Sequence, residues 1–265
     1  MGRAWVATAV VLAAATLAAC GSSSSSSTTT SGPASATTTT YPASVAVFGD
    51  SLAAESQTYF TNLVKAADES VTTFYSSKGG SATCDWLGEM KTLASTHHLE
   101  AVELVFSGNA FTPCMGDVGY YNPAWLAKYR TYTLDAIDIW VPTGAHVYLI
   151  GTPITRNEQE SVPNWDELNL LYAQLAAADP DHVSYVDAGA AVEGPNQTFA
   201  QTLPCLPVEP CTGPVVGGVH SNVVRSPDGV HFCPVQGDDH GACPVYASGA
   251  FRFANAMVEA LATTS

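Results

Sequence analysis

Short apolar runs rich in β-branched residues recur along the chain and alternate with longer segments of helical periodicity. The runs are Ser44–Phe48, Val71–Tyr75, Ala101–Phe106, His146–Ile150 and Val183–Val186. Helices are predicted over Leu52–Ala67, Asp85–Ser95, Pro123–Trp140, Trp165–Ala178 and Ala247–Ala262. Because the runs lack strict alternation, they suit strands buried on both faces. The pattern predicts an α/β protein, a three-layer α/β/α sandwich with a roughly five-stranded parallel sheet and its chemistry at the carboxyl ends of the strands.

The first residues of the chain have the pattern of an export signal. Arg3 supplies a positive charge, and Ala4–Leu17 is an uncharged apolar run, too short for a typical spanning helix. The run ends in Leu-Ala-Ala-Cys at Cys20, which resembles the bacterial lipobox. That resemblance implies that residues 1–19 are a signal peptide and that Cys20 becomes a lipidated N-terminus held in the membrane. Ordinary secretion without lipidation is the alternative.

A low-complexity segment separates this signal from the rest of the chain. Of the 20 residues from Gly21 to Thr40, 15 are Ser or Thr and none is aromatic. With nothing to bury, residues 20–40 are predicted to form a disordered tether that spans roughly 25 Å. Residues 41–265 show neither an internal repeat nor a second linker, and they are enough for one domain with a full core.

The charge balance excludes several classes of partner. Nine Lys and Arg residues against 24 Asp and Glu residues give a formal net charge of -15. Such a chain has few cations with which to neutralise a run of phosphates or dock on anionic lipid, so no nucleic acid partner is expected. The acidic balance otherwise indicates only a soluble surface.

Seven cysteines are present, and six remain when Cys20 is set aside. An even number in an exported protein predicts disulfides, and proximity favours local pairs among the fifteen possible connectivities. The pairs are Cys84 with Cys114, Cys205 with Cys211, and Cys233 with Cys243. The alternative is a metal site with the ligands Cys233, Cys243, His231 and His240. The chain has no Cys-x-x-Cys pair, so three disulfides and no metal are predicted.

Four places carry polar residues or glycines where the predicted topology puts chemistry. They are Gly49-Asp50-Ser51-Leu52 after the first strand, Gly79-Gly80-Ser81 after the second, Ser107-Gly108-Asn109 after the third, and Asp228-Gly229-Val230-His231 before the last helix. A serine nucleophile needs a base, and the base needs a carboxylate on its other nitrogen. Glycine N–H groups and a side-chain amide are donors to an oxyanion. Each place alone also has a structural explanation, as a helix cap or a turn.

Taken in order, the four places resemble the sequence blocks of the GDSL, or SGNH, hydrolase family, which carry Ser, Gly, Asn and His. The resemblance covers the layout of residues 41–265 and implies the flavodoxin-like α/β/α fold of that family. It also implies a catalytic triad. Ser51 would be the nucleophile, His231 the general base and then the general acid, and Asp228 the carboxylate that orients His231.

The same resemblance implies an oxyanion hole. Its donors would be the N–H groups of Ser51 and Gly80 and the side-chain amide of Asn109, with Gly79 as the rival of Gly80. The third block departs from the family pattern in two places. Ser107 stands where the family commonly has glycine, and Ala110 stands where it commonly has aspartate.

These residues predict an exported serine esterase that acts through an acyl-enzyme and needs no cofactor. No long apolar lid is evident, which favours short acyl groups on a cell-envelope glycan as substrate. Trp86, Tyr120, Tyr121 and Trp125 are candidates for lining its cleft, or else for the core. We expect a monomer anchored on the outer face of the bacterial cytoplasmic membrane or in the cell envelope. The alternatives are an acyltransferase between envelope glycans and a non-catalytic lipoprotein that binds carbohydrate or acyl groups.

Overall fold

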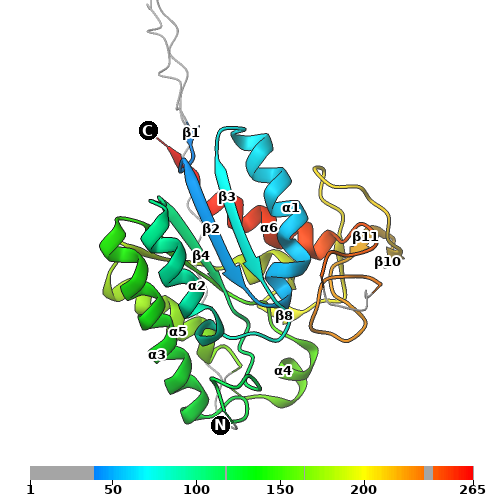
Figure 1. Cartoon of the computed structure of the whole chain (residues 1–265). Helices are drawn as coiled ribbons and strands as arrows, with labels where there is room; N and C mark the ends of the chain where they lie inside the picture. The colour runs from blue at the N-terminus through cyan, green and yellow to red at the C-terminus, as the bar shows by residue number, and fades with distance from the viewer. Residues whose placement is uncertain (1–38, 117, 164, 236–240, 265) are drawn as a thin grey trace, which may run out of the picture. The chain divides into compact units, whose positions relative to one another are not determined.

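The computed structural model describes residues 39–116, 118–163, 165–235 and 241–264 (Figure 1). The predicted signal peptide, Cys20 and the tether up to residue 38 lie outside the described residues. Thr39–Thr40, which the sequence assigned to the tether, form the short strand β1 and pair with β12 (Thr263–Thr264). Within the described ranges, no helix is long and apolar enough to cross a membrane.

Five parallel strands form the central sheet, in the spatial order β3-β2-β4-β5-β6. They are β2 (Ser44–Gly49), β3 (Thr72–Ser77), β4 (Ala101–Val105), β5 (His146–Ile150) and β6 (Val183–Val186). Counted along the chain, the spatial order is 2-1-3-4-5, that of flavodoxin-like sheets. All five predicted strands are present, and the predicted fold class is confirmed.

Helices cover both faces of this sheet (Figure 1). On one face lie α1 (Ser51–Ala67) and α6 (Ser248–Ala260), which pack against each other. On the other face lie α2 (Thr83–Thr96), α3 (Pro123–Trp140) and α5 (Glu167–Ala178). The five predicted helices are therefore present, with ends shifted by a few residues at most.

Each face of the sheet has its own apolar core. Val45 and Val47 of β2 belong to the core under α1 and α6, whereas Ala46 and Phe48 belong to the core under α2, α3 and α5. Successive residues of a strand point to opposite faces. A strand buried on both faces is therefore apolar at most of its positions, which is why the sequence showed continuous runs.

Between β5 and α6 the chain forms several short elements that the sequence did not predict. They are α4 (Arg156–Ser161), β7 (Glu193–Gly194), β8 (Thr198–Phe199), β9 (Thr202–Pro204), β10 (Val215–Val216), β11 (Val219–Val223) and the 3-10 helix η2 (Ala188–Val192); a further 3-10 turn, η1 (Val141–Thr143), follows α3. Strands β10, β11 and β9 make a small antiparallel sheet outside the central one. Elements of two to six residues are too short for hydrophobic periodicity to reveal.

Three disulfides join the pairs of cysteines that proximity favoured. Cys84 at the start of α2 is bonded to Cys114 in the loop after β4, Cys205 to Cys211, and Cys233 to Cys243. The first bond joins the helix that follows β3 to the loop that follows β4, and these two strands lie on either side of β2 in the sheet. The third bond lies in the segment that leads from His231 to α6.

Replacing both Cys84 and Cys114 with serine is expected to lower the free energy of unfolding by about 3–4 kcal/mol, because the bond closes a loop 30 residues long. The same double change at Cys205 and Cys211, which are 6 residues apart, is expected to lower it by about 2 kcal/mol. Urea unfolding of both variants measures the difference. A larger loss at the short loop would contradict an origin in the entropy of the unfolded chain.

Candidate active site

Ser51 is the first residue of α1, and Asp50 alone separates it from the carboxyl end of β2. Asp50, rather than Ser51, is the N-cap of this helix, because its Oδ1 accepts a hydrogen bond from the N–H of Leu52 at 3.0 Å. The helix-cap explanation of Ser51 is therefore wrong. Its side chain is instead free to face the C-terminal loop.

Ser51 meets His231 and Asp228 from the opposite end of the chain. Oγ of Ser51 lies 2.9 Å from Nε2 of His231, and Nδ1 of His231 lies 2.7 Å from Oδ2 of Asp228. The other oxygen of Asp228 accepts the N–H groups of Val230 at 2.8 Å and His231 at 3.1 Å. The structure thus brings all three predicted triad residues into one hydrogen-bonded chain.

The carboxyl group of Asp228 is only partly buried, and its environment favours the ionised form. Burial alone would raise its pKa, but the hydrogen bonds from the His231 ring and from two backbone N–H groups outweigh it and lower the pKa to about 2. A carboxylate at this place holds a proton on Nδ1 of His231 and leaves Nε2 as the acceptor that faces Ser51. Asp228 is therefore charged at any neutral pH.

Asp50 organises the bottom of the site, a role that the sequence reading missed. Its carboxyl group is fully buried, and burial raises its pKa against the hydrogen bonds it accepts. Oδ2 lies 2.6 Å from the N–H nitrogen of Ser107, 2.6 Å from its hydroxyl and 3.1 Å from Nδ2 of Asn109. Ser107, one of the two departures from the family pattern, thus supplies two contacts to Asp50 where glycine would supply one. Ala110, the other departure, is buried in the core.

Asn109 lies at the site, but both hydrogens of its amide face acceptors within the protein. Nδ2 is 3.1 Å from Oδ2 of Asp50 and 3.1 Å from the carbonyl oxygen of Ser81. The side chain is therefore fixed in position. An oxyanion would have to compete with the Ser81 carbonyl for one of the two hydrogens.

Gly79 and Gly80 form a tight turn at the carboxyl end of β3. The N–H of Ser81 donates to the carbonyl of Lys78 at 3.2 Å, and Gly80 has φ +74, a left-handed conformation that favours glycine. Nothing in the described structure lies within 4 Å of a Cβ added at Gly80. The turn thus opens onto free space, and its geometry alone accounts for a glycine at position 80.

Two hollows flank this arrangement. One, of about 450 Å³, is lined by Lys78, Gly79, Gly80, Ser81, Asp85, Trp86, Glu89, Phe111, Thr112 and Pro113. The other, of about 210 Å³, is lined by residues that include Asn109, Tyr120, Tyr121, Thr155, Glu158 and Val230. Three of the four aromatic candidates therefore line a hollow. The fourth, Trp125, is buried in the core, where its Nε1 donates to the carbonyl of Gly108 at 2.9 Å.

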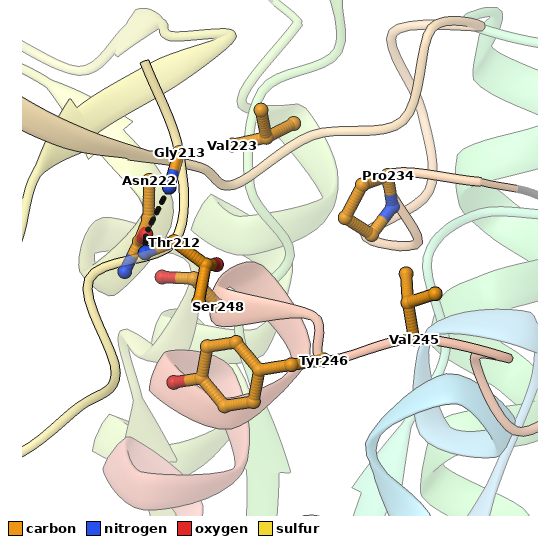
Figure 2. A pocket seen from close by; sticks show the side chains of 8 residues that line it. All are labelled: Thr212, Gly213, Asn222, Val223, Pro234, Val245, Tyr246 and Ser248. Carbon is orange, nitrogen blue, oxygen red and sulfur yellow. Dashed lines mark hydrogen bonds between the residues drawn. The ribbon is translucent and has the colours of Figure 1, made fainter. Parts of the chain in front are cut away.

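A third hollow, of about 340 Å³, lies between the β11 region and the start of α6 (Figure 2). None of the eight residues that line it belongs to the triad. The side-chain oxygen of Asn222 accepts the N–H groups of Thr212 at 2.9 Å and Gly213 at 3.1 Å, and the Ser248 hydroxyl donates to Glu209. These polar groups are engaged within the protein, and they serve the fold of this region.

The disulfide between Cys233 and Cys243 contradicts the alternative of a metal site with these cysteines as ligands. Cys233 and Cys243 are bonded to each other, so they offer no thiolates, and His240 lies outside the described residues. Clusters of potential ligands do occur, at Glu55 with these two cysteines and at Asp85 with Cys84 and Cys114. In both, the sulfur atoms are used in disulfides.

Comparisons with known proteins agree with this fold. A model of the family described as "Protein of unknown function (DUF459)" matches residues 44–240. No curated protein sequence matches the chain. The lipase/acylhydrolase from Enterococcus faecalis is similar at 16% identity and a TM-score of 0.54, over 82% of this chain and 94% of that one. A Bacteroides fragilis protein classed as an acylhydrolase is similar at 15% identity and a TM-score of 0.52, over 82% and 86%. An acetylxylan esterase from Geobacillus stearothermophilus matches at 16% identity and a TM-score of 0.45, over 56% and 77%.

Proposed function

The chain belongs to the DUF459 family, and we propose that it is a serine hydrolase that cleaves ester-linked acyl groups. One observation carries the proposal: the hydrogen-bonded chain from Ser51 through His231 to Asp228, with distances of 2.9 and 2.7 Å. A helix cap and an Asp-Gly turn would not require these residues, 180 positions apart, to meet. The fold shared with the two acylhydrolase structures supports the proposal as analogy.

The chemistry follows the hydrogen bonds. Oγ of Ser51 attacks the ester carbonyl carbon while Nε2 of His231 takes its proton, and Asp228 stabilises the imidazolium. The bond to the leaving alcohol then breaks as His231 returns the proton to the alcohol oxygen. Water, activated by the same histidine, attacks the acyl-enzyme, releases the carboxylic acid and restores Ser51.

The oxyanion formed in each step needs donors. The N–H of Ser51 lies at the start of α1, where helix N–H groups lack partners within the helix. The turn at Gly79 and Gly80 is the second source. Asn109 is the third, and its donation is in competition with the carbonyl of Ser81 at 3.1 Å. We propose Ser51, Gly80 and Asn109 as the oxyanion hole.

The surroundings favour a short acyl group and a polar alcohol. Both hollows beside the site are small and carry charged residues, Lys78, Asp85 and Glu89 in one and Glu158 in the other. We therefore propose esters of a cell-envelope glycan, cleaved outside the cytoplasm by a protein tethered through Cys20. The three disulfides support an oxidising compartment. Transfer of the acyl group to a sugar hydroxyl uses the same acyl-enzyme, with another acceptor than water.

Labelling of the purified protein with a fluorophosphonate tests the proposal. We expect wild type to be labelled at Ser51, Ser51→Ala to show no label, and His231→Ala to be labelled at a strongly reduced rate, because the hydroxyl then lacks its base. Turnover of p-nitrophenyl acetate should fall in parallel. A well-folded wild type that neither labels nor turns over short esters would favour the binding lipoprotein.

A further inference from the structure

Glu55 lies one helical turn after Ser51 and is buried in the protein interior. Residues four apart on a helix share a face, so the serine and the carboxyl group both face the C-terminal loop. Oε2 of Glu55 accepts hydrogen bonds from the N–H of Phe232 at 2.6 Å and from the N–H of Cys233 at 3.2 Å. These are the two residues that follow His231.

The loop that carries His231 is held from several sides. The N–H of Ser226 donates to the carbonyl of His231 at 2.6 Å, which closes the loop on itself. The buried Arg225 donates to the carbonyl of Val230 at 2.6 Å, and the N–H of Arg156 donates to the carbonyl of Gly229 at 3.0 Å. These contacts tie the loop to itself and to α4. The contact of Glu55 ties it to the helix that begins with Ser51.

We propose that Glu55 is a positioning residue for the reaction: it sets the distance between Ser51 and His231 by fastening the backbone after His231 to the helix of Ser51. This inference rests on the proposed function. The nucleophile and its base come from segments far apart in the sequence, so their separation depends on how rigidly the loop is docked on α1. A misplacement of about 1 Å in such a pair lowers the rate by about 10²-fold.

The carboxyl group suits this task because it accepts two N–H groups with one oxygen. Burial raises its pKa, and the two N–H donors and the His231 ring oppose that shift. A neutral amide in its place also presents an oxygen acceptor. An apolar side chain of similar size presents none and would leave two N–H groups unpaired in the interior.

Three variants separate positioning from a general loss of stability. Glu55→Leu removes the acceptor, and Glu55→Gln keeps an oxygen at its place. Glu209→Gln is the matched control, since Glu209 is a buried carboxyl group that accepts a hydrogen bond from Ser248 and pairs with Arg252 of α6, away from the His231 loop. Each is assayed with p-nitrophenyl acetate and with the fluorophosphonate, and each is unfolded in urea.

We expect Glu55→Leu to lower kcat and the labelling rate by about 10²-fold with KM unchanged. Glu55→Gln should retain most of both rates, and Glu209→Gln should lose stability with kcat intact. Equal damage from Gln and Leu at position 55, or a loss of kcat in the Glu209 control at matched stability, would overturn the positioning role.

Amide hydrogen exchange at Phe232 gives a readout that does not depend on activity. Exchange should be faster in Glu55→Leu than in wild type or Glu55→Gln. Unchanged exchange in Glu55→Leu would overturn the contact itself. A different outcome is also possible: exchange is faster in Glu55→Leu, but the wild-type protein shows neither labelling nor turnover. That result would refute the proposed function, and with it the effect of Glu55 on catalysis, while leaving the contact established.

Discussion

Replacing Asp228 with asparagine is expected to lower kcat for ester hydrolysis by about 10⁴-fold, the effect seen when a triad histidine is held in the wrong tautomer. The reason lies in the two N–H groups of Val230 and His231 that donate to Oδ1 of Asp228. In the asparagine variant these donors select the amide oxygen for that place. The amide nitrogen then faces Nδ1 of His231 and donates a hydrogen bond to it. Nδ1 therefore carries no proton, and the ring proton lies on Nε2, which cannot take another from Ser51.

A matched control for this change exists on the surface. Asp179 pairs with His182 at 2.8 Å, also three residues apart, and both side chains are about half exposed. Asp179→Asn should leave kcat unchanged. Activity is measured on p-nitrophenyl acetate across neutral pH, with urea unfolding to verify that both variants fold. A kcat for Asp228→Asn within tenfold of wild type would show that Asp228 does not govern the tautomer.

The central fold was largely readable from the sequence because the inner strands β2 and β4 are buried on both faces. After Ser44, β2 has no polar side chain, and the helices between strands are long enough to show their period. Short elements carry no such signal. Helix α4 begins with a Thr155–Glu158 capping box, which was the one local cue to its presence. The antiparallel strands β9 to β11 are held by pairing partners that no local pattern reveals.

The sequence predicted those site residues whose type and local motif indicate a catalytic role. Ser51, His231 and Asp228 stand in recognisable local contexts, and their meeting could be inferred from the topology. Asp50 and Glu55 act through partners that are distant in the sequence. Ser107 lies 57 positions after Asp50, and Phe232 lies 177 positions after Glu55. Nothing in the spacing of a sequence reports such pairs. An acidic residue one turn after the proposed nucleophile, on the face toward the core, is the signal that would have drawn attention to Glu55.

The clearest effect on the free energy of unfolding is expected from a substitution at Glu103. It lies in the middle of β4, beside Val47 of β2 and Tyr148 of β5, and its side chain is fully buried. Neither carboxyl oxygen has a hydrogen-bond partner among the described residues. Burial raises its pKa from the ordinary value of 4.5 to about 8. The folded protein therefore holds Glu103 in its neutral form at pH 7.

Glu103 makes the folded protein less stable as the pH rises, because its buried carboxyl group keeps a proton that the unfolded chain releases. Below pH 4.5 the carboxyl group is protonated in both folded and unfolded chains, and it imposes no ionisation penalty. As the pH rises from there to about 8, the unfolded chain gains by ionising while the folded protein does not, so stability falls. At pH 7 the loss is about 3 kcal/mol, because stability falls by about 1.4 kcal/mol for each pH unit above the unfolded pKa of 4.5.

Glu103→Gln, which resembles the neutral acid in shape, is therefore expected to raise the free energy of unfolding at pH 7 by about 3 kcal/mol. The gain should vanish near pH 4.5 and reach its full size above pH 8. Urea unfolding at a series of pH values measures it, with Glu160→Gln on the exposed face of α4 as a control that should show no such trend. A gain that did not grow with pH would mean that folded Glu103 ionises like an exposed carboxyl group. Groups on the neighbouring strands β2 and β5 would then have to stabilise the ionised carboxylate of Glu103.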